Sequence, residues 1–294
     1  MKEKCNLCNN DEYDLVYEGK IRSAGVGSEF VEGFKILECN SCKINVLSPF
    51  PDNLKEFYES EEYRKHYDHT TNEKELASKY DFEQNDRINK IGIENLRGKV
   101  VADYGCGVGL FLDVIKGVTK KTIAVEPMIA CMHILKNKGH VYYEYPINVK
   151  EDSLDIAVSF DALEHIDKPL VFLNSIYNSL KKDGIFYISI PNKNDILMNV
   201  HNEFYQEFFY CKAHLYYYDI KTLSYVIEKA GFRIVEKSGI HKYDFFNFIS
   251  WLKTDKPCGR KYLSFVDSFF ESGFNNELIR MNMSSHLFIK AQKQ

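Results

Sequence analysis

A glycine-rich turn directly behind an apolar run constrains the fold of this chain more than any other feature. In VADYGCGVGL, residues 101–110, the glycines are Gly105, Gly107 and Gly109. Glycine adopts backbone angles that are closed to other residues, and it lets a ligand approach the main chain. A dinucleotide-binding turn has the spacing GxGxxG, which would put its third glycine where Leu110 stands. The spacing GxGxG is therefore typical of a different cofactor loop, or of a tight turn without a ligand.

From about residue 98 onward, apolar strands alternate with helical segments. The strand-like runs VVADYG, TIAVEP, LDIAVSF and IFYISIPN are separated by segments such as FLDVIKG and PLVFLNSIYNSLKKDG. This alternation predicts a doubly wound, Rossmann-like α/β fold, with a parallel sheet covered by helices on both faces. Two later runs, near 233–239 and 286–293, should close the sheet. The Phe- and Tyr-rich segment between them, at about 241–284, is expected to be a helical insertion that shapes a pocket or a homodimer contact.

Four cysteines near the N-terminus form two CxxC pairs. CNLC contains Cys5 and Cys8, and CNSC contains Cys39 and Cys42. Two such pairs at this separation are typical of a closed, tetrahedral Cys₄ zinc site, which would stabilise residues 1–50 as a small zinc-ribbon module with a sparse core. Unrelated buried cysteines and a redox pair are the alternatives. Because a structural zinc has no open coordination position, we assign it no catalytic role.

A proline-rich segment marks the end of the module. LSPFPDN, at 47–53, contains two prolines that break regular structure. Residues 54–68 and 73–96 are charged and aromatic at helical spacing, which predicts a helical linker or cap over 51–97 that leads into a domain over 98–294. The inward-facing positions predicted for this cap are Leu76, Tyr80, Ile88, Ile91 and Leu96.

Composition limits the partners of the chain. Its 294 residues are 45% hydrophobic, which is ample for a packed core. The formal net charge of −4 gives no global basic field, so nucleic acid is an unlikely partner. No run of about 18 apolar residues is present, and no apolar stretch follows the charged start MKEKCNLCNN. We therefore expect neither a membrane span nor a signal peptide, and a cytoplasmic protein.

An acidic residue follows the glycine turn at the sequence separation expected of a ribose-binding carboxylate. TIAVEP places Glu126 about 20 residues further on, at the end of the next strand, where a carboxylate can accept two hydrogen bonds from a ribose diol. VADYGCGVG, AVEP, LDIAVSFDALEHIDKP and LKKDGIFYISIPN together resemble the successive motifs of class I S-adenosylmethionine-dependent methyltransferases. The resemblance covers about residues 85–294. It implies that S-adenosylmethionine is the cofactor.

The resemblance also implies which residues hold that cofactor. Asp103 would support the loop, and Gly105 and Gly107 would face the methionine and ribose portions. The other contacts that it implies are Glu126 to the ribose hydroxyls, Pro127 and Met128 beside the adenine, and Phe160, Asp161 and Ala162 on the sulfonium side. Many members of the class place an acidic residue after the third strand for the adenine amine, but VYYEYPINVKEDS shows no obvious equivalent.

A four-cysteine module joined to this core resembles the sugar C-methyltransferases that act on nucleotide-linked deoxysugars, and related enzymes of surface-polysaccharide and natural-product pathways. In those enzymes the small module helps to cover the acceptor pocket. The aromatic segment FYESEEYRKHY would by the same resemblance place Tyr63 or Tyr67 over the cofactor. The alternative for both tyrosines is amphipathic packing.

Two histidines are candidate bases for methyl transfer. His165 follows the fourth strand and His214 follows the fifth, and open α/β sheets place their sites at these carboxyl ends. A histidine near neutral pKa can take a proton from a hydroxyl. The sugar C-methyltransferases have a Tyr-x-Glu-His-type cluster, of which HLYYYDIKTL keeps only the histidine, because CKA precedes it. A hydroxyl acceptor is therefore favoured over a carbon, although each histidine could simply bond to backbone.

Asp161, Glu164, His165 and His214 also resemble the metal-binding residues of small-RNA 2′-O-methyltransferases, and such a set could hold a hard divalent cation beside a hydroxyl. Our leading hypothesis is a methyltransferase that acts on a small polar acceptor such as a sugar, a nucleotide-sugar or a surface-polysaccharide precursor. Two alternatives remain open. One is an RNA or protein methyltransferase that uses the zinc module as a substrate reader, and the other is a non-catalytic scaffold that retains the fold.

Overall fold

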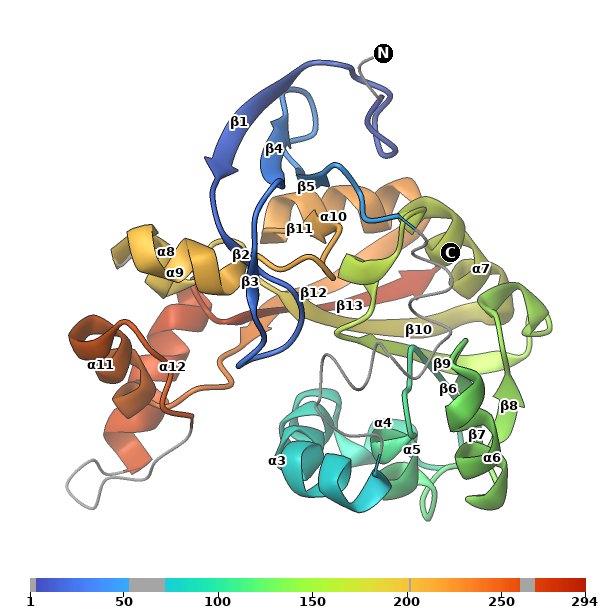
Figure 1. Cartoon of the computed structure of the whole chain (residues 1–294). Helices are drawn as coiled ribbons and strands as arrows, with labels where there is room; N and C mark the ends of the chain where they lie inside the picture. Colours follow the sequence, from blue (N-terminus) through green and yellow to red (C-terminus); the bar gives the residue numbers. More distant parts are fainter. Residues whose placement is uncertain (1–3, 53–71, 201, 260–267) are drawn as a thin grey trace.

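A seven-stranded sheet forms the centre of the molecule (Figure 1). The computed structural model describes residues 4–52, 72–200, 202–259 and 268–294. In spatial order the strands are β12 (Phe232–Ile240), β13 (His286–Lys293), β10 (Leu180–Pro191), β9 (Leu154–Phe160), β6 (Val100–Tyr104), β7 (Lys121–Val125) and β8 (Val141–Tyr143). β13 runs antiparallel to both of its neighbours, and the pairs from β10 to β8 are parallel. The Rossmann-like α/β fold predicted from the alternating pattern is confirmed.

Helices cover both faces of this sheet, so its strands are buried on both sides. Successive residues of β6 contribute to different cores: Val101 packs on one face and Ala102 on the other. This is why the parallel strands read as continuous apolar runs rather than as an alternating pattern. The helices of one layer are α3 (Glu73–Ile91), α5 (Leu110–Ile115) and α6 (Ile129–Asn137), and those of the other are α7 (Pro169–Ser179) and α10 (Ile220–Lys229).

The cap before the main sheet is helical where the structure describes it. Asn72 caps α3, because its side chain accepts hydrogen bonds from the backbone of Lys74 and Glu75. The short helix α4 (Ile93–Leu96) follows α3. Of the predicted inward positions, Leu76, Ile91 and Leu96 are buried. Tyr80 and Ile88 are half-buried against the same core. The helix predicted over 54–68 lies outside the described residues.

The N-terminal module does not close on itself. Its sheet has the order β1 (Tyr13–Glu18), β4 (Lys35–Cys39), β5 (Asn45–Ser48) and β11 (Tyr216–Tyr217), so its last strand comes from the main domain. A second ribbon, β2 (Ile21–Arg22) with β3 (Phe30–Val31), reaches down toward the main sheet (Figure 1). The predicted boundary near residue 50 therefore separates segments of sequence, while the two parts share a sheet.

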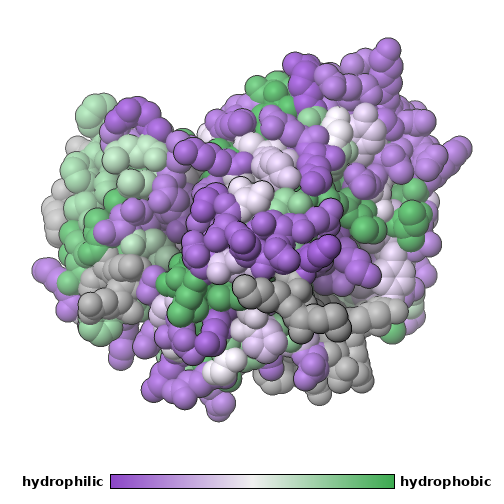
Figure 2. Space-filling model, turned by 90° about the horizontal axis from the view of Figure 1, so that it is seen from above, coloured by the Kyte–Doolittle hydropathy of each residue, from purple (hydrophilic) through white to green (hydrophobic). Residues whose placement is uncertain are grey.

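Four helices, three of them rich in aromatic residues, lie at one end of the molecule. They are α8 (Ile196–Val200), α9 (Asn202–Phe209), α11 (Phe245–Thr254) and α12 (Ser268–Arg280), the last two from the predicted insertion. Trp251 of α11 packs edge-on against Tyr205 and Phe208 of α9, with ring centroids 5.0 and 4.8 Å apart. Seen from the module side, hydrophobic side chains gather at this end, on the left of Figure 2. None of the described helices is long and apolar enough to cross a membrane.

Candidate active site

The carboxyl ends of β6, β7 and β9 open into one cavity of about 780 Å³. It is lined by most of the residues predicted for the site: Asp103, Gly105, Glu126, Pro127, Phe160, Asp161, Ala162, His165 and His214. Gly107 and Met128 do not line the cavity. Tyr63 and Tyr67 lie outside the described residues. A cavity of this size is near the upper part of the range of about 300–1,000 Å³ for small-molecule sites, so it has room for a cofactor and an acceptor.

The glycine turn is shaped mainly by the protein around it. Gly105 has φ +84°, and a Cβ added there would stand 2.6 Å from the Cβ of Ala162. Gly109 has φ +82° and begins α5, where an added Cβ would meet Leu135 at 2.7 Å. At these two positions the close neighbours are therefore protein side chains, where the sequence suggested a ligand. Gly105 nevertheless exposes its backbone to the cavity.

Glu126 stands where β7 ends and is held in place by backbone. Its Oε2 accepts a hydrogen bond from the Gly107 amide at 2.8 Å, and its Oε1 accepts one from the Met128 amide at 3.1 Å. This explains the roles of Gly107 and Met128: both orient the carboxylate, and the Met128 side chain packs in the core. A carboxylate oxygen has further lone pairs, so Glu126 can still accept hydrogen bonds from a ribose diol in the cavity.

Asp103 is buried at the end of β6, below the turn. Burial raises the pKa of Asp103 to about 7, and the nearby charge of Glu126 adds to this rise while Arg87 opposes it. A carboxyl group in this position can change its charge when a cation arrives in the cavity.

Asp161 is the centre of a charged network on the floor of the cavity. Its Oδ2 lies 2.9 Å from Arg87 Nη2 and 2.9 Å from Lys242 Nζ, and its Oδ1 lies 3.4 Å from His286 Nε2. Both cations also pair with Glu83, at 3.1 and 3.2 Å. Although burial acts against ionisation, these partners hold the pKa of Asp161 well below its usual range. Asp161 thus belongs to an ion-pair network in this structure.

Glu164, His165 and His214 form a second buried cluster beside the cavity. One ligand atom from each lies within 4.8 Å of the others. The two imidazoles meet edge to face, with ring centroids 4.8 Å apart, and His165 Nδ1 donates to the carbonyl of Ala213 at 2.8 Å. Burial, the neighbouring imidazole of His165 and the charge of Arg22 hold the pKa of His214 well below 6.5. Burial and the charge of Asp161 raise the pKa of Glu164 well above 4.5.

This arrangement differs from the four-residue cation site suggested by the sequence. Asp161 does not join the cluster, because its carboxylate is ion-paired with Arg87 and Lys242. Glu164, His165 and His214 keep ligand atoms close enough for one ion. Both oxygens of Glu164 are buried and have no hydrogen-bond partner within the described part of the chain, which fits the carboxylate of a cation site.

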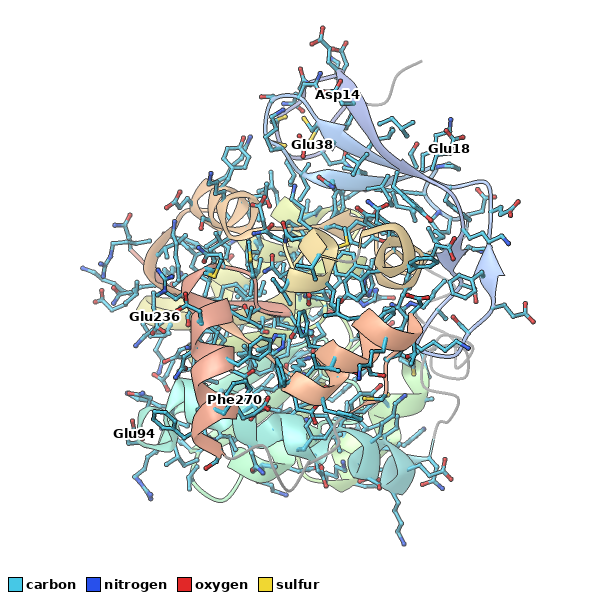
Figure 3. All side chains as sticks on the ribbon, turned by 90° about the vertical axis from the view of Figure 1, so that its left-hand side faces the viewer. Asp14, Glu18, Glu38, Glu94, Glu236 and Phe270 are labelled. Carbon is cyan, nitrogen blue, oxygen red and sulfur yellow. The ribbon has the colours of Figure 1, made fainter. Side chains whose placement is uncertain are left out.

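The four N-terminal cysteines come together as two matched turns. All four sulfurs lie within 4.8 Å of one another, with Cys5 to Cys42 at 3.7 Å and Cys8 to Cys39 at 3.4 Å. Sulfurs bound tetrahedrally to zinc at about 2.3 Å would be about 3.8 Å apart, so this spacing fits the metal. In Figure 3, Asp14 and Glu38 mark the outer end of the module, beside a group of sulfur atoms.

The two cysteine turns repeat the same backbone hydrogen bonds. Cys5 O accepts from the amide of Asn9 at 2.8 Å, and Cys39 O accepts from the amide of Lys43 at 2.9 Å. Asn9 and Lys43 both adopt positive φ, at 63° and 61°. All four cysteines are free thiols. The repeated geometry presents two thiols from each turn toward a common point.

Several cavity residues were missed by sequence reasoning. Glu144 and Tyr145, directly after β8, line the cavity at the place where no equivalent for an adenine contact was apparent. Arg22, Asp195 and Lys242 also line it, from a short ribbon, a loop and the insertion. Such residues carry no local motif, and only tertiary structure brings them to one cavity. For Glu144 the signal was present, since it is an acidic residue directly after the third parallel strand.

A seven-stranded sheet of this order, with a glycine turn after β6 and a buried acidic residue after β7, defines the class I S-adenosylmethionine-dependent methyltransferases. The sequence profile of the family described as "Methyltransferase domain" matches residues 66–237, more than half of the chain, and the chain belongs to this family. A crystal structure of a SAM-dependent methyltransferase from Archaeoglobus fulgidus aligns with a TM-score of 0.50 at 20% identity, covering 72% of this chain and 94% of that one. That likeness concerns the fold alone.

Curated relatives match a shorter segment. The ubiquinone biosynthesis O-methyltransferase of Bradyrhizobium diazoefficiens is 29% identical over 121 residues, covering 38% of this chain and 46% of that protein. The protein of the same name from Neisseria meningitidis is 30% identical over 118 residues, covering 35% and 48%. A probable S-adenosylmethionine-dependent methyltransferase of Mycolicibacterium smegmatis is 26% identical over 107 residues, covering 33% and 39%. The chain spans about half the length of the curated relatives it matches, or less.

Proposed function

We propose that this chain transfers the methyl group of S-adenosylmethionine to a hydroxyl of a small polar acceptor. The observation that carries the proposal is that one cavity of about 780 Å³ contains both the turn at Gly105 with Glu126 and the histidines His165 and His214. The first group suits a nucleoside donor, and the second suits a hydroxyl that must lose its proton. The Bradyrhizobium and Neisseria relatives are named O-methyltransferases, which supports a hydroxyl acceptor.

The chain's part in this reaction is alignment and proton transfer. When bound, S-adenosylmethionine supplies a methyl group activated by a sulfonium, and Glu126 and the Gly105 backbone would hold its ribose and methionine portions. Because His165 donates through Nδ1 to the carbonyl of Ala213, Nε2 is the ring nitrogen that can accept a proton. Burial keeps His214 neutral, since it lowers the pKa of that imidazole. Either imidazole can therefore act as the base.

A bound divalent cation is a second way to activate the hydroxyl. Glu164, His165 and His214 would hold it, and a hard cation in that position would lower the pKa of an acceptor hydroxyl. Removal of metal separates the two possibilities. If a chelator abolishes turnover, S-adenosylmethionine binding persists and Mg²⁺ or Mn²⁺ restores turnover, then the cation is required. If turnover survives the chelator, the histidines act alone.

We propose a sugar, a nucleotide-sugar or a related surface-polysaccharide precursor as the acceptor, and a structural zinc in the cysteine module. The matched cysteine turns and the ribbon that reaches the cavity support a module that helps to form the pocket. An RNA or protein substrate read by the module is the alternative; the net charge of −4 argues against RNA. A complex with RNA in a gel-shift at low salt would favour that alternative.

Cofactor binding and turnover test the proposal. Calorimetry should detect S-adenosylmethionine binding to the wild type, and Glu126→Gln should weaken it about tenfold or more because the ribose loses its carboxylate partner. Glu18→Gln, an exposed residue of the module edge, is the matched control and should bind normally. A screen of hydroxylated sugars and nucleotide-sugars should yield S-adenosylhomocysteine. Absent cofactor binding, or an unaffected Glu126→Gln, would contradict the proposal, and binding without turnover on any acceptor would favour a scaffold.

A further inference from the structure

Arg22 is a buried cation that the N-terminal module delivers to the cavity. It lies in β2, is only 7% exposed, and lines the cavity. Backbone pairing fixes its position: the Arg22 amide donates to Tyr210 O at 3.1 Å, and the Lys212 amide donates to Arg22 O at 2.8 Å. The ribbon is thereby joined to the segment that leads to His214.

Among the described residues, the guanidinium of Arg22 has only neutral partners. Its Nε donates to the carbonyl of Phe208, its Nη1 donates to the carbonyl of Ala24 at 3.2 Å, and it stands 4.4 Å above the Phe208 ring. No carboxylate of the described residues lies within 4.0 Å of it. A guanidinium carries five N–H donors, and these two hydrogen bonds leave three for a ligand.

The other buried cations that line the cavity are paired with carboxylates. Arg87 and Lys242 both pair with Glu83 and Asp161, which balances their charges. A buried charge without an opposite charge is costly to a folded protein. Arg22 is therefore the cation of this cavity whose charge the described residues leave uncompensated, as is expected of a residue that binds an anionic ligand.

Arg22 also lies on the acceptor side of the cavity. Its backbone pairs with Cys211 and Lys212, which shortly precede His214 in the chain, and Arg22 and His214 line the same cavity. Phe208, Phe209 and Tyr205, all of α9, form an aromatic wall of the cavity around it. The turn at Gly105 and Glu126 comes instead from strands of the main sheet.

We propose that the acceptor carries an oxyanion, a phosphate or a carboxylate, which Arg22 binds while the acceptor hydroxyl faces His214. This inference rests on the proposed function and specifies its substrate class: an anionic, hydroxylated small molecule. Two parallel N–H···O bonds from the planar guanidinium fit either anion, and the aromatic wall suits a ring next to it. A nucleotide-sugar satisfies this chemistry through its phosphates, and a hydroxylated aromatic acid satisfies it through its carboxylate.

The single tryptophan of the chain offers a direct readout. Trp251 packs on Phe208, whose ring also contacts Arg22. With the chain saturated by S-adenosylhomocysteine, phenyl phosphate, benzoate and neutral benzyl alcohol are titrated while Trp251 fluorescence is recorded. We expect at least one anion to bind more tightly than benzyl alcohol. Tighter binding of phenyl phosphate identifies a phosphate-bearing acceptor, and tighter binding of benzoate identifies a carboxylate.

Substitutions of Arg22 complete the test. Arg22→Gln should weaken binding of the anion about tenfold or more. Arg22→Lys should weaken anion binding less, because lysine keeps the positive charge but lacks the planar two-pronged guanidinium. The control Arg233→Gln, on the exposed surface of β12, should behave as the wild type. Equal binding of benzyl alcohol and both anions, or unchanged binding in Arg22→Gln, overturns the inference.

Two further measurements separate anion binding by Arg22 from a role in folding and from the proposed function itself. Arg22→Gln should keep its melting temperature, since it removes an uncompensated charge; a large loss would mean that the guanidinium serves folding, and would overturn the inference. S-adenosylmethionine affinity, measured by calorimetry, should be the same in the wild type and Arg22→Gln. If the wild type binds the anion through Arg22 but binds no S-adenosylmethionine, the proposed function fails while the oxyanion site stands.

Discussion

Gly105 meets two demands at one residue. Its φ of +84° is unfavourable for any residue with a Cβ, and a Cβ would stand 2.6 Å from Ala162. Gly105→Ala should therefore lower the free energy of unfolding by about 2–5 kcal/mol, the sum of a left-handed backbone and an overpacked contact. Urea unfolding measures the change. The variant should also bind S-adenosylmethionine more weakly, because the turn that borders the cavity must shift.

Gly98→Ala is the matched control for this prediction. Gly98 has φ +69°, but nothing lies within 4 Å of an added Cβ. The Gly98→Ala variant should lose only about 1–2 kcal/mol of unfolding free energy, from backbone strain alone, and should keep its affinity for the cofactor. Equal losses in the two alanine variants would show that the contact with Ala162 relaxes without cost.

His214 predicts a pH dependence of stability. Its pKa in the folded chain lies well below 6.5, so the unfolded chain binds a proton between that lowered pKa and about pH 6.5 and the folded chain does not. Stability should thus fall as pH falls through this window, by up to about 1.4 kcal/mol per pH unit. His214→Asn should lose less stability than the wild type between pH 8 and pH 5.5, as measured by urea unfolding.

Other groups titrate in the same range, so the comparison is made between variants. Asp103, with its pKa raised to about 7, destabilises the folded chain as pH rises, in the wild type and the variant alike. His133→Asn, on the exposed side of α6, is the matched histidine control and should follow the wild type. An unchanged pH dependence in His214→Asn would mean that the buried imidazole is not the group that titrates.

At the scale of elements, the matched cysteine turns predict that metal holds the module together. Purified chain should contain about one zinc, and Cys39→Ser should lose it, because three thiolates and a hydroxyl make a weaker site. The melting temperature should fall when the zinc is lost. Elemental analysis and thermal unfolding measure both effects.

Cys258→Ser is the control for the zinc prediction. Cys258 is half-buried outside both turns, and its sulfur lies 3.9 Å from Asn247 Oδ1. The Cys258→Ser variant should keep its zinc and the melting temperature of the wild type. Full zinc content in Cys39→Ser would contradict the assignment of these four cysteines.

Four strands of the main sheet could be predicted from the sequence because each is an apolar run beside a helical segment. The parallel strands β6, β7, β9 and β10 show this pattern, since burial on both faces leaves little room for polar residues. β11 could not be predicted, because a two-residue strand has no periodicity of its own. Its partner β5 lies far away in the sequence, and only the folded chain brings them together.

The residues of the candidate site also divide into those that the sequence predicts and those that only the fold reveals. Gly105, Glu126 and His165 could be predicted, because each follows a strand whose end faces the cavity. His214 also lines the cavity, but it follows α9 and precedes β11, so it does not come directly from the end of the fifth predicted strand. The partners of Asp161 could not, since Arg87, Lys242 and His286 come from three distant segments. No local spacing in the sequence reveals that these residues meet.

At the scale of the whole molecule, shared sheets predict cooperative unfolding. β11 of the main domain completes the sheet of the module, and Lys229 of α10 donates to Leu7 O within the first cysteine turn at 2.5 Å. The zinc-loaded chain should therefore unfold in a single transition in differential scanning calorimetry. After zinc removal that transition should move to lower temperature as one peak. Two resolved peaks would show that the module unfolds independently of the main domain.

The ribbon β2–β3 has a consequence for how such a chain can diversify. The residues that we propose hold the donor follow residue 98, while Arg22, which we propose binds the acceptor, lies on a short ribbon attached by few backbone bonds. If Arg22 binds the acceptor as proposed, changes in that ribbon should alter which molecule is methylated without disturbing how the methyl group is supplied. Grafting a relative's ribbon onto this scaffold would accordingly redirect substrate preference while leaving the chemistry of transfer intact.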